Sequence, residues 1–273
     1  GGESLNHQRM EALQHYVKPG CVCYNIGGYK GYYSGVLAIK GAKEVFVFEP
    51  MPANVEKIRK LIELNPALPI RLKEYAVSDT NGEAVFKLMP EETMGKLEAS
   101  SFQQEDQSVT ELTVNCITLD ELISSGVPEP DFIKIDVEGF EQSVIEGLAA
   151  TIARDQPIVA LELNHWCLNA FQRISVPDFF NFLRSVFPYL YAVDMRYASN
   201  LRDRLYRELL PSFYDKKDAQ NLHDPDAAYH VMYRHILHGS SYPTLVGAFN
   251  PTQLTALSAL LGIQSARRGE MMR

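Results

Sequence analysis

The fold is decided by the stretch Val22-Cys23-Tyr24-Asn25-Ile26-Gly27-Gly28-Tyr29-Lys30-Gly31-Tyr32-Tyr33-Ser34. It predicts a β-strand that stops at paired glycines and a helix that begins soon after them, because apolar residues then recur with helical spacing. A tight strand-to-helix turn lets backbone N–H groups come close to a ligand at the N-terminus of the helix. The stretch therefore indicates an α/β unit that binds a ligand at this turn.

A second short apolar run, over residues 44–48, is followed by Glu49. Glu49 lies about 20 residues beyond the glycines, the spacing at which nucleotide-binding α/β units place a carboxylate on ribose hydroxyls. One carboxylate accepts hydrogen bonds from two neighbouring hydroxyls at once. We therefore expect Glu49 to bind a ribose. The alternative is an ordinary βαβ unit with a surface glutamate at its strand end.

The spacing of the glycines argues against a dinucleotide ligand. The pattern G-x-G-x-x-G, started at Gly27, needs glycine where Tyr29 and Tyr32 stand, and it also fails when started at Gly28. A pyrophosphate would therefore lack its usual cradle. This makes a nucleotide-dependent oxidoreductase the less favoured class of enzyme, and a binding domain without catalytic activity is a further alternative.

The composition is that of a globular chain: of 273 residues, 46% are hydrophobic and 22% charged. A net charge of −8 argues against a nucleic-acid partner, because phosphate contacts need clustered lysines and arginines. No run is long enough for a transmembrane helix, and no secretory signal is present. The four cysteines show neither zinc-finger nor disulfide spacing. We therefore expect a cytoplasmic protein without a bound structural metal.

Polar side chains follow two further predicted strands. A strand that ends at Asp136 is followed by Glu138, and a strand over residues 158–163 is followed by His165. Ligands in open α/β sheets bind outside the carboxyl ends of the strands, so we expect these side chains to face the same crevice as the glycines. The alternative is that the acids cap helices and that the histidine is merely half exposed.

Five segments in this order resemble the FkbM-type family of S-adenosylmethionine-dependent methyltransferases, and together they cover about residues 20–195. They are Asn25-Ile26-Gly27-Gly28-Tyr29-Lys30-Gly31-Tyr32-Tyr33-Ser34, Phe48-Glu49-Pro50-Met51-Pro52-Ala53-Asn54, Ala76-Val77-Ser78-Asp79, Ile117-Thr118-Leu119-Asp120 and Ile133-Lys134-Ile135-Asp136-Val137-Glu138-Gly139.

The resemblance implies an α/β fold of the class I methyltransferase, Rossmann-like type. Its sheet is mostly parallel with an antiparallel last strand, and helices cover both faces. We expect a single methyltransferase domain over residues 1–273, with an N-terminal helix at 4–19, a cofactor-binding core at 20–195 and C-terminal additions at 196–273. The opening Gly1-Gly2 resembles an expression remnant, which leaves room for a neighbouring domain.

The resemblance also implies O-methylation of a hydroxyl on a sugar, a glycan or another natural product, with S-adenosylmethionine as the cofactor. It assigns to cofactor binding, by residue, Asn25, Gly27, Gly28, Gly31, Glu49, Ser78, Asp79 and Asp136. The glycines would hold the methionine part, Glu49 the ribose, and Ser78 with Asp79 the adenine. The family usually has an acid where Asn25 stands and an asparagine where Tyr29 stands, so we expect contacts to the ammonium group to be weakened or rerouted.

Methyl transfer to an alcohol needs a base that accepts the hydroxyl proton as the new bond forms. The candidate catalytic residues are His165, Asp136 and Glu138, and histidine has the pKa best matched to neutral pH. We expect a base without a metal ion. The alternative is that Asp136, with Glu162 and Asn164, holds a divalent cation such as Mg²⁺.

Several expectations concern the periphery. Residues 71–77 are predicted as a third strand, 83–89 and 109–117 as an antiparallel pair, and Ala228 to Tyr233 as the final strand. Thr118 is predicted to cap a short helix that starts after it. The polar loop Glu91 to Ser108 is a candidate lid or a plain excursion.

Arginines and tyrosines over 196–207 suit either a glycan or a solvated helix face. We expect an amphipathic helix after Gln253, structural roles for His230, His235 and His238, and a glycan or small-molecule acceptor, with a homo-oligomer as an open alternative.

Overall fold

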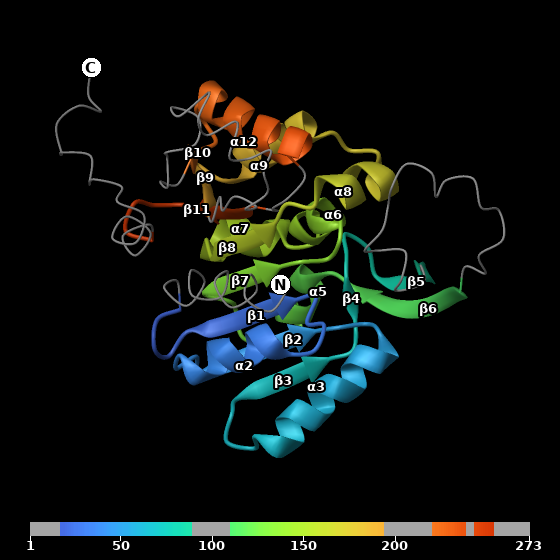
Figure 1. Ribbon diagram of the computed structural model, residues 1–273. Helices are drawn as coiled ribbons and strands as arrows, with labels where there is room; N and C mark the ends of the chain where they lie inside the picture. The colour runs from blue at the N-terminus through green and yellow to red at the C-terminus, as the bar shows by residue number, and fades with distance from the viewer. Residues whose placement is uncertain (1–16, 89–109, 194–219, 239–242, 254–273) are drawn as a thin grey trace.

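The core of the fold is an eight-stranded sheet with β1 (Val22–Ile26) near its centre (Figure 1). The computed structural model describes residues 17–88, 110–193, 220–238 and 243–253. The strands lie in the order β10-β9-β11-β8-β7-β1-β2-β3, which runs from top to bottom in Figure 1. The other strands of this sheet are β2 (Glu44–Phe48), β3 (Ile70–Lys73), β7 (Phe132–Ile135), β8 (Ile158–Glu162), β9 (Tyr189–Val193), β10 (Gln220–Asn221) and β11 (Thr244–Ala248).

The predicted fold class is confirmed by the directions of these strands. β1 pairs in parallel with β2 and β7, β2 with β3, and β7 with β8. β11 runs antiparallel to both β8 and β9, as expected for the last strand, and the short β10 pairs antiparallel with β9 at the edge. An α/β sheet with parallel strands needs helical crossovers on its faces.

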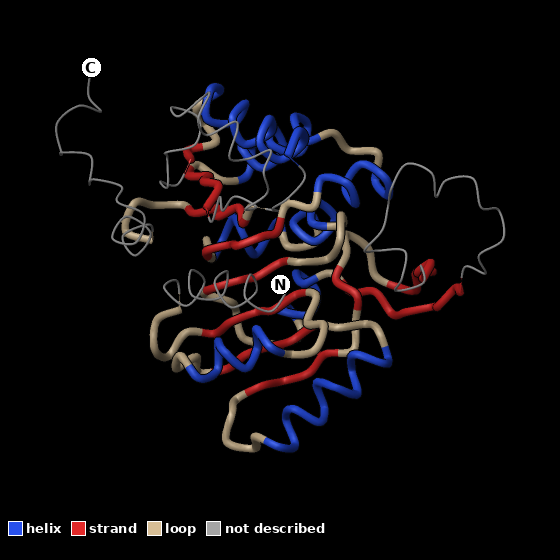
Figure 2. Tube along the Cα trace, viewed as in Figure 1, coloured by secondary structure: helices blue, strands red, loops and turns tan. Residues whose placement is uncertain are grey.

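Helices cover both faces of the sheet, because alternate residues of each strand point to opposite sides. Tyr24 and Ile26 of β1 belong to one buried cluster, and Cys23 belongs to the other. Figure 2 shows the strands stacked through the middle with helices around them. The helices are α2 (Tyr32–Ile39), α3 (Pro52–Leu64), α5 (Leu119–Ser124), α6 (Glu141–Glu146), α7 (Ala149–Asp155), α8 (His165–Gln172), α9 (Val176–Val186) and α12 (Pro225–His238).

A second sheet, of three strands, stands beside the first, and one predicted strand is divided between the two sheets. The predicted third strand over 71–77 is broken: β3 ends at Lys73, and β4 (Ala76–Val77) joins the small sheet in the order β4-β6-β5. The predicted antiparallel pair is confirmed as β5 (Gly82–Leu88) and β6 (Thr110–Ile117). The break arises because Ala76 and Val77 find hydrogen-bond partners on β6 rather than on β2.

The prediction of a final strand over Ala228 to Tyr233 is wrong, because these residues lie within α12. Ala227, Ala228 and Val231 are buried, and this i, i+1, i+4 spacing is helical. The backbone N–H of Ala228 donates to Asp224 O at 2.9 Å in the first turn. The antiparallel last strand is instead β11.

Other expectations fall on residues outside the described ranges. They are the N-terminal helix before Val17, the loop Glu91 to Ser108, the segment 196–207 and the helix after Gln253. The side chains of His235 and His238 are likewise not described. Within the described ranges, no helix combines the length and apolar character that crossing a bilayer requires.

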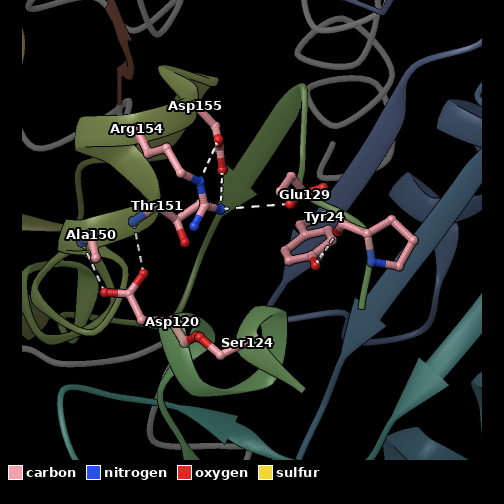
Figure 3. Close-up of polar contacts among 9 residues, drawn as sticks. Tyr24, Asp120, Ser124, Glu129, Ala150, Thr151, Arg154 and Asp155 are labelled. Carbon is pink, nitrogen blue, oxygen red and sulfur yellow. Dashed lines mark hydrogen bonds and ion pairs between the residues drawn. The ribbon is translucent and has the colours of Figure 1, made fainter. Parts of the chain in front are cut away.

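Asp120, from the fourth of the segments that resemble the family, caps a neighbouring helix (Figure 3). Its two carboxylate oxygens accept from the backbone N–H groups of Ala150 and Thr151, each at 2.9 Å, in the first turn of α7. Thr118 caps α5 as predicted and accepts from Glu121 N. Asp120 therefore joins the start of α5 to the start of α7, two helices on one face of the sheet.

Replacement of Asp120 by alanine should lower the free energy of unfolding by about 0.5–2 kcal/mol, because two N–H groups of α7 lose their acceptor. Urea unfolding of the purified protein measures this. Glu129→Ala is the control, since exposed Glu129 lies 3.8 Å from Arg154 across an exposed ion pair, and its loss should cost less than about 0.5 kcal/mol. Equal effects of the two changes would contradict the capping role.

Candidate functional site

The glycine loop after β1 is held against two neighbouring strands. The N–H groups of Gly27 and Gly28 donate to Phe48 O at 3.1 and 3.0 Å. Gly27 has φ +79, and a Cβ on it would lie 1.8 Å from Asp136 O. A Cβ on Gly28 would lie 2.3 Å from a methyl group of Val47. Glycine is thus required here for packing against β2 and β7, in addition to any ligand contact.

Glu49 is buried and anchors the same loop. It is 4% exposed, and its carboxylate accepts from Tyr29 N at 2.7 Å and from Met51 N at 2.9 Å. Burial raises the pKa of Glu49, and these N–H donors oppose that rise. A carboxylate oxygen has a further lone pair, so Glu49 can accept from a ligand hydroxyl as well. The structure thus adds a loop-holding role to the predicted ribose-binding role.

Asn25 contributes a buried acceptor beside the glycine loop. Its side chain is fully buried, and Nδ2 donates to Ser34 Oγ at 2.9 Å. Its Oδ1 has no hydrogen-bond partner among the residues that the structure describes. An unsatisfied buried acceptor is costly and calls for a donor. Asn25 and Glu49 are therefore acceptors that fit S-adenosylmethionine, whose ammonium group and ribose hydroxyls are donors.

Ser78 and Asp79, the predicted adenine contacts, follow β4 rather than a strand of the main sheet. Ser78 Oγ donates to Asp79 Oδ1 at 2.9 Å, and Ser78 N donates to Ile117 O. The backbone of Gly147 packs on them, since a Cβ there would lie 2.0 Å from Ser78 O. Ser78 is half-buried and Asp79 is exposed, which leaves the Asp79 carboxylate accessible to a ligand.

Three carboxylates converge at the carboxyl ends of β7 and β8. One oxygen each of Asp136, Glu138 and Glu162 lies within 4.8 Å of the others. Glu138 thus joins Asp136 and Glu162 of the sequence-based cation alternative, and the third residue of that alternative, Asn164, donates from its Nδ2 to Glu138 Oε2 at 2.7 Å. Hard oxygen ligands in such a group can hold a divalent cation. The expectation of a base without a metal stays a prediction.

Lys134 is a functional candidate that sequence reasoning missed. It is 6% exposed, and its Nζ lies 2.8 Å from Asp136 Oδ2 and 4.5 Å from the centroid of the Tyr33 ring. A buried lysine requires a counter-charge, and this ion pair orients the Asp136 carboxylate. The signal in the sequence was a lysine between apolar residues in the middle of a predicted buried strand.

The loop between β7 and α6 is shaped by a second missed residue, Glu141. Its Oε1 accepts from the N–H groups of Val137 and Gly139, both at 3.2 Å, and the side chain is 2% exposed. Between them Glu138 has φ +51, a left-handed conformation that is uncommon outside glycine. Burial raises the pKa of Glu141 to about 7, with a further rise from Asp136. Glu141 therefore sets the backbone that carries Glu138.

His165 begins α8, immediately after Asn164, whose Oδ1 caps the helix by accepting from Cys167 N at 3.2 Å. The imidazole is half-buried, and burial lowers its pKa. His165 is therefore neutral at pH 7 and able to accept a proton. The structure brings Asp136 and Glu138 together directly, and it links His165 to them through the neighbouring Asn164.

The raised pKa of Glu141 predicts a pH dependence of stability. The native protein holds this proton up to about pH 7, whereas an unfolded chain releases it near the ordinary value of 4.5. Between these values the native state binds more protons, so the free energy of unfolding should fall as pH rises and level off above about pH 7. Glu141→Gln should remove this component in urea unfolding series. Glu146→Gln, on the exposed side of α6, should keep it; an unchanged slope in Glu141→Gln would exclude Glu141 as its source.

Comparison with known proteins gives one family match. The family model described as "Methyltransferase FkbM domain" matches residues 25–205. A curated relative, the hexuronic acid methyltransferase AglP of Haloferax volcanii, is 30% identical over 128 residues, which are 46% of this chain and 49% of that protein. This chain therefore aligns with about half the length of that relative.

Two solved structures are similar to this chain at low sequence identity. The methyltransferase FkbM of Methylobacillus flagellatus KT is 17% identical, with a TM-score of 0.46 over 63% of this chain and 40% of that chain. A Streptococcus mutans protein, described as a methyltransferase and solved in complex with SAH, is 7% identical, with a TM-score of 0.46 over 89% of this chain and 97% of that chain.

Proposed function

This chain belongs to the FkbM methyltransferase family, and from that premise we propose that it transfers a methyl group from S-adenosylmethionine to a hydroxyl group of a sugar. The observation that carries the proposal is the convergence of acceptor groups at one edge of the sheet. Asn25 and Glu49 lie at the ends of β1 and β2, and the three carboxylates lie at the ends of β7 and β8. That edge is where open α/β sheets bind ligands. The name of the Haloferax relative supports a sugar as acceptor.

S-adenosylmethionine, when bound, supplies a methyl group made electrophilic by its sulfonium. In this proposal Asn25 Oδ1 accepts from the ammonium group, and Glu49 accepts from the ribose hydroxyls. The backbone of Gly27, Gly28 and Gly31 lies against the methionine part, with Ser78 and Asp79 at the adenine. The proposal is supported by the buried, unpartnered Oδ1 and by the carboxylate at the end of β2.

The acceptor hydroxyl is a poor nucleophile until its proton is removed. Its oxygen forms the new bond to the methyl carbon as the carbon–sulfur bond breaks, and the proton passes to a base of this chain. Glu138 is exposed and His165 is held neutral by burial, so both are suited to accept it. Asp136, paired with Lys134, orients the acceptor or the cofactor. We propose Asp136, Glu138 and His165 as the catalytic group, without a metal ion.

Glu49→Ala should weaken S-adenosylhomocysteine binding by about tenfold or more, because hydrogen bonds to a charged group contribute roughly 1.5–3 kcal/mol each. Isothermal titration calorimetry measures the change. Glu44→Ala, at the start of the same strand, is the matched control and should bind normally. The competitor 2′,3′-dideoxyadenosine lacks the ribose diol and should bind wild type and Glu49→Ala alike. If this competitor binds Glu49→Ala more weakly than it binds the wild type, Glu49 acts through the glycine loop rather than through the ribose.

Asp136→Asn and His165→Ala should each retain S-adenosylhomocysteine binding and lose most methyl transfer, by about 100-fold or more, since proton removal contributes roughly 10²–10⁴-fold. Release of S-adenosylhomocysteine with a panel of methyl hexopyranosides gives the rate, and Glu63→Gln on exposed α3 is the control. EDTA should leave the wild type active. Loss of activity on chelation, followed by recovery with Mg²⁺, would contradict the metal-free base and favour a metal held at the three carboxylates. Absence of turnover in the wild type would favour a silent binding domain.

A further inference from the structure

Four aromatic side chains from three separate segments contact one another beside the candidate acids. Phe86 comes from β5, Phe140 from the turn before α6, and Trp166 and Phe171 from α8. The ring centroids of Phe86 and Phe140 are 6.2 Å apart, those of Phe140 and Phe171 6.5 Å, and those of Trp166 and Phe171 5.7 Å. We call Phe86, Phe140, Phe171 and Trp166 the aromatic row. Figure 1 shows β5, α6 and α8 toward the same side of the molecule.

The aromatic row does not serve the core. Among the described residues, none of the four belongs to either buried cluster or to the partly buried residues packed against those clusters. Phe171 is 45% exposed, and the other three rings are half-buried. A contiguous aromatic surface that stays partly exposed costs free energy in water, and such a surface on a folded protein usually marks a binding site.

The aromatic row lies on the same segments as the proposed catalytic group. Trp166 directly follows His165, and Phe140 follows Glu138 by two residues. The hydrogen bond of 2.7 Å from Asn164 to Glu138 ties these two segments together. Gly139 lets them approach closely, since a Cβ there would lie 2.6 Å from the backbone of Cys167. A molecule on the row would therefore border the groups that handle the acceptor hydroxyl.

We propose that the aromatic row is the platform on which the pyranose ring of the acceptor lies. This inference rests on the proposed sugar methylation and names the surface that selects the sugar. A pyranose has one face of C–H groups, which fits against aromatic rings, and hydroxyl donors around its edge. Glu138 supplies the matching acceptor, because it is exposed and the side chains that donate to it among the described residues, Asn164 and Cys167, are uncharged.

A wholly apolar acceptor fits this surface less well. It would cover the exposed carboxylate of Glu138 and give it no donor, which is a costly desolvation. The rings and the carboxylate together form a surface with a few polar groups set in an aromatic wall, as ligand sites commonly have. The occupant that satisfies both parts is a hydroxylated ring of pyranose size.

Trp166 is the single tryptophan of the chain, so intrinsic fluorescence reports directly on the aromatic row. The protein, saturated with S-adenosylhomocysteine, is titrated with methyl glucopyranoside, methyl galactopyranoside and methyl mannopyranoside, and with cyclohexanol as an apolar ring of the same size. At least one glycoside should change the emission and saturate. Phe171→Ala should weaken the binding of that glycoside about two- to tenfold. The affinity for S-adenosylhomocysteine, measured by calorimetry, should be unchanged. Tyr229→Ala, which removes another exposed aromatic ring, on α12, should have no effect.

The outcomes separate this inference from the proposed function. Normal S-adenosylhomocysteine binding with no response to any glycoside, or saturation by cyclohexanol alone, would overturn the sugar platform and leave the methyltransferase assignment in place. Failure to bind S-adenosylhomocysteine would instead overturn the proposed function together with this inference. A wild-type dimer that Phe171→Ala converts to a monomer in sedimentation would show that a second copy of the chain covers the row.

Discussion

The site depends on the close approach of the glycine loop to the carbonyl of Asp136. Gly27 packs so near this carbonyl that a Cβ would lie 1.8 Å from the oxygen, and both Gly27 and Gly28 donate to Phe48 O. A loop pinned between the ends of β2 and β7 cannot drift away from either strand end. The candidate cofactor loop, Glu49 and the acid at the end of β7 are therefore parts of one rigid unit.

Three buried or half-buried carboxylates stabilise parts of this fold in the same way, each by accepting two backbone N–H groups. Glu49 holds the glycine loop and the entry to α3, Glu141 holds the turn that carries Glu138, and Asp120 holds the start of α7. Backbone donors at turns and helix starts have no partner within their own element, so a side-chain acceptor fixes their geometry. The acids of this fold thus divide into those that position loops and those that face the candidate site.

The candidate chemistry requires both kinds of acid to lie close together. Asp136 is balanced by Lys134, whereas Glu138 stays exposed beside Asn164 and the aromatic row. Burial lowers the pKa of His165 and raises that of Glu141, because loss of water disfavours the charged form of each group. A polar, proton-accepting edge next to an aromatic surface is the combination that a hydroxylated ring requires.

The sequence by itself determined the elements whose signals are local. Periodicity and turn residues predicted β1, β2, β7 and β8, the hairpin of β5 and β6, and the Thr118 cap, because each depends on residues a few positions apart. Only the tertiary structure decided that β4 leaves the main sheet, that 228–233 are helical, and that Glu138 lies with Asp136 and Glu162. The tertiary structure also decided the roles of Lys134 and Glu141 and brought together the aromatic row. In each of these features, the hydrogen-bond or packing partners come from segments that are distant in sequence. The local sequence pattern does not indicate which distant segments will pair.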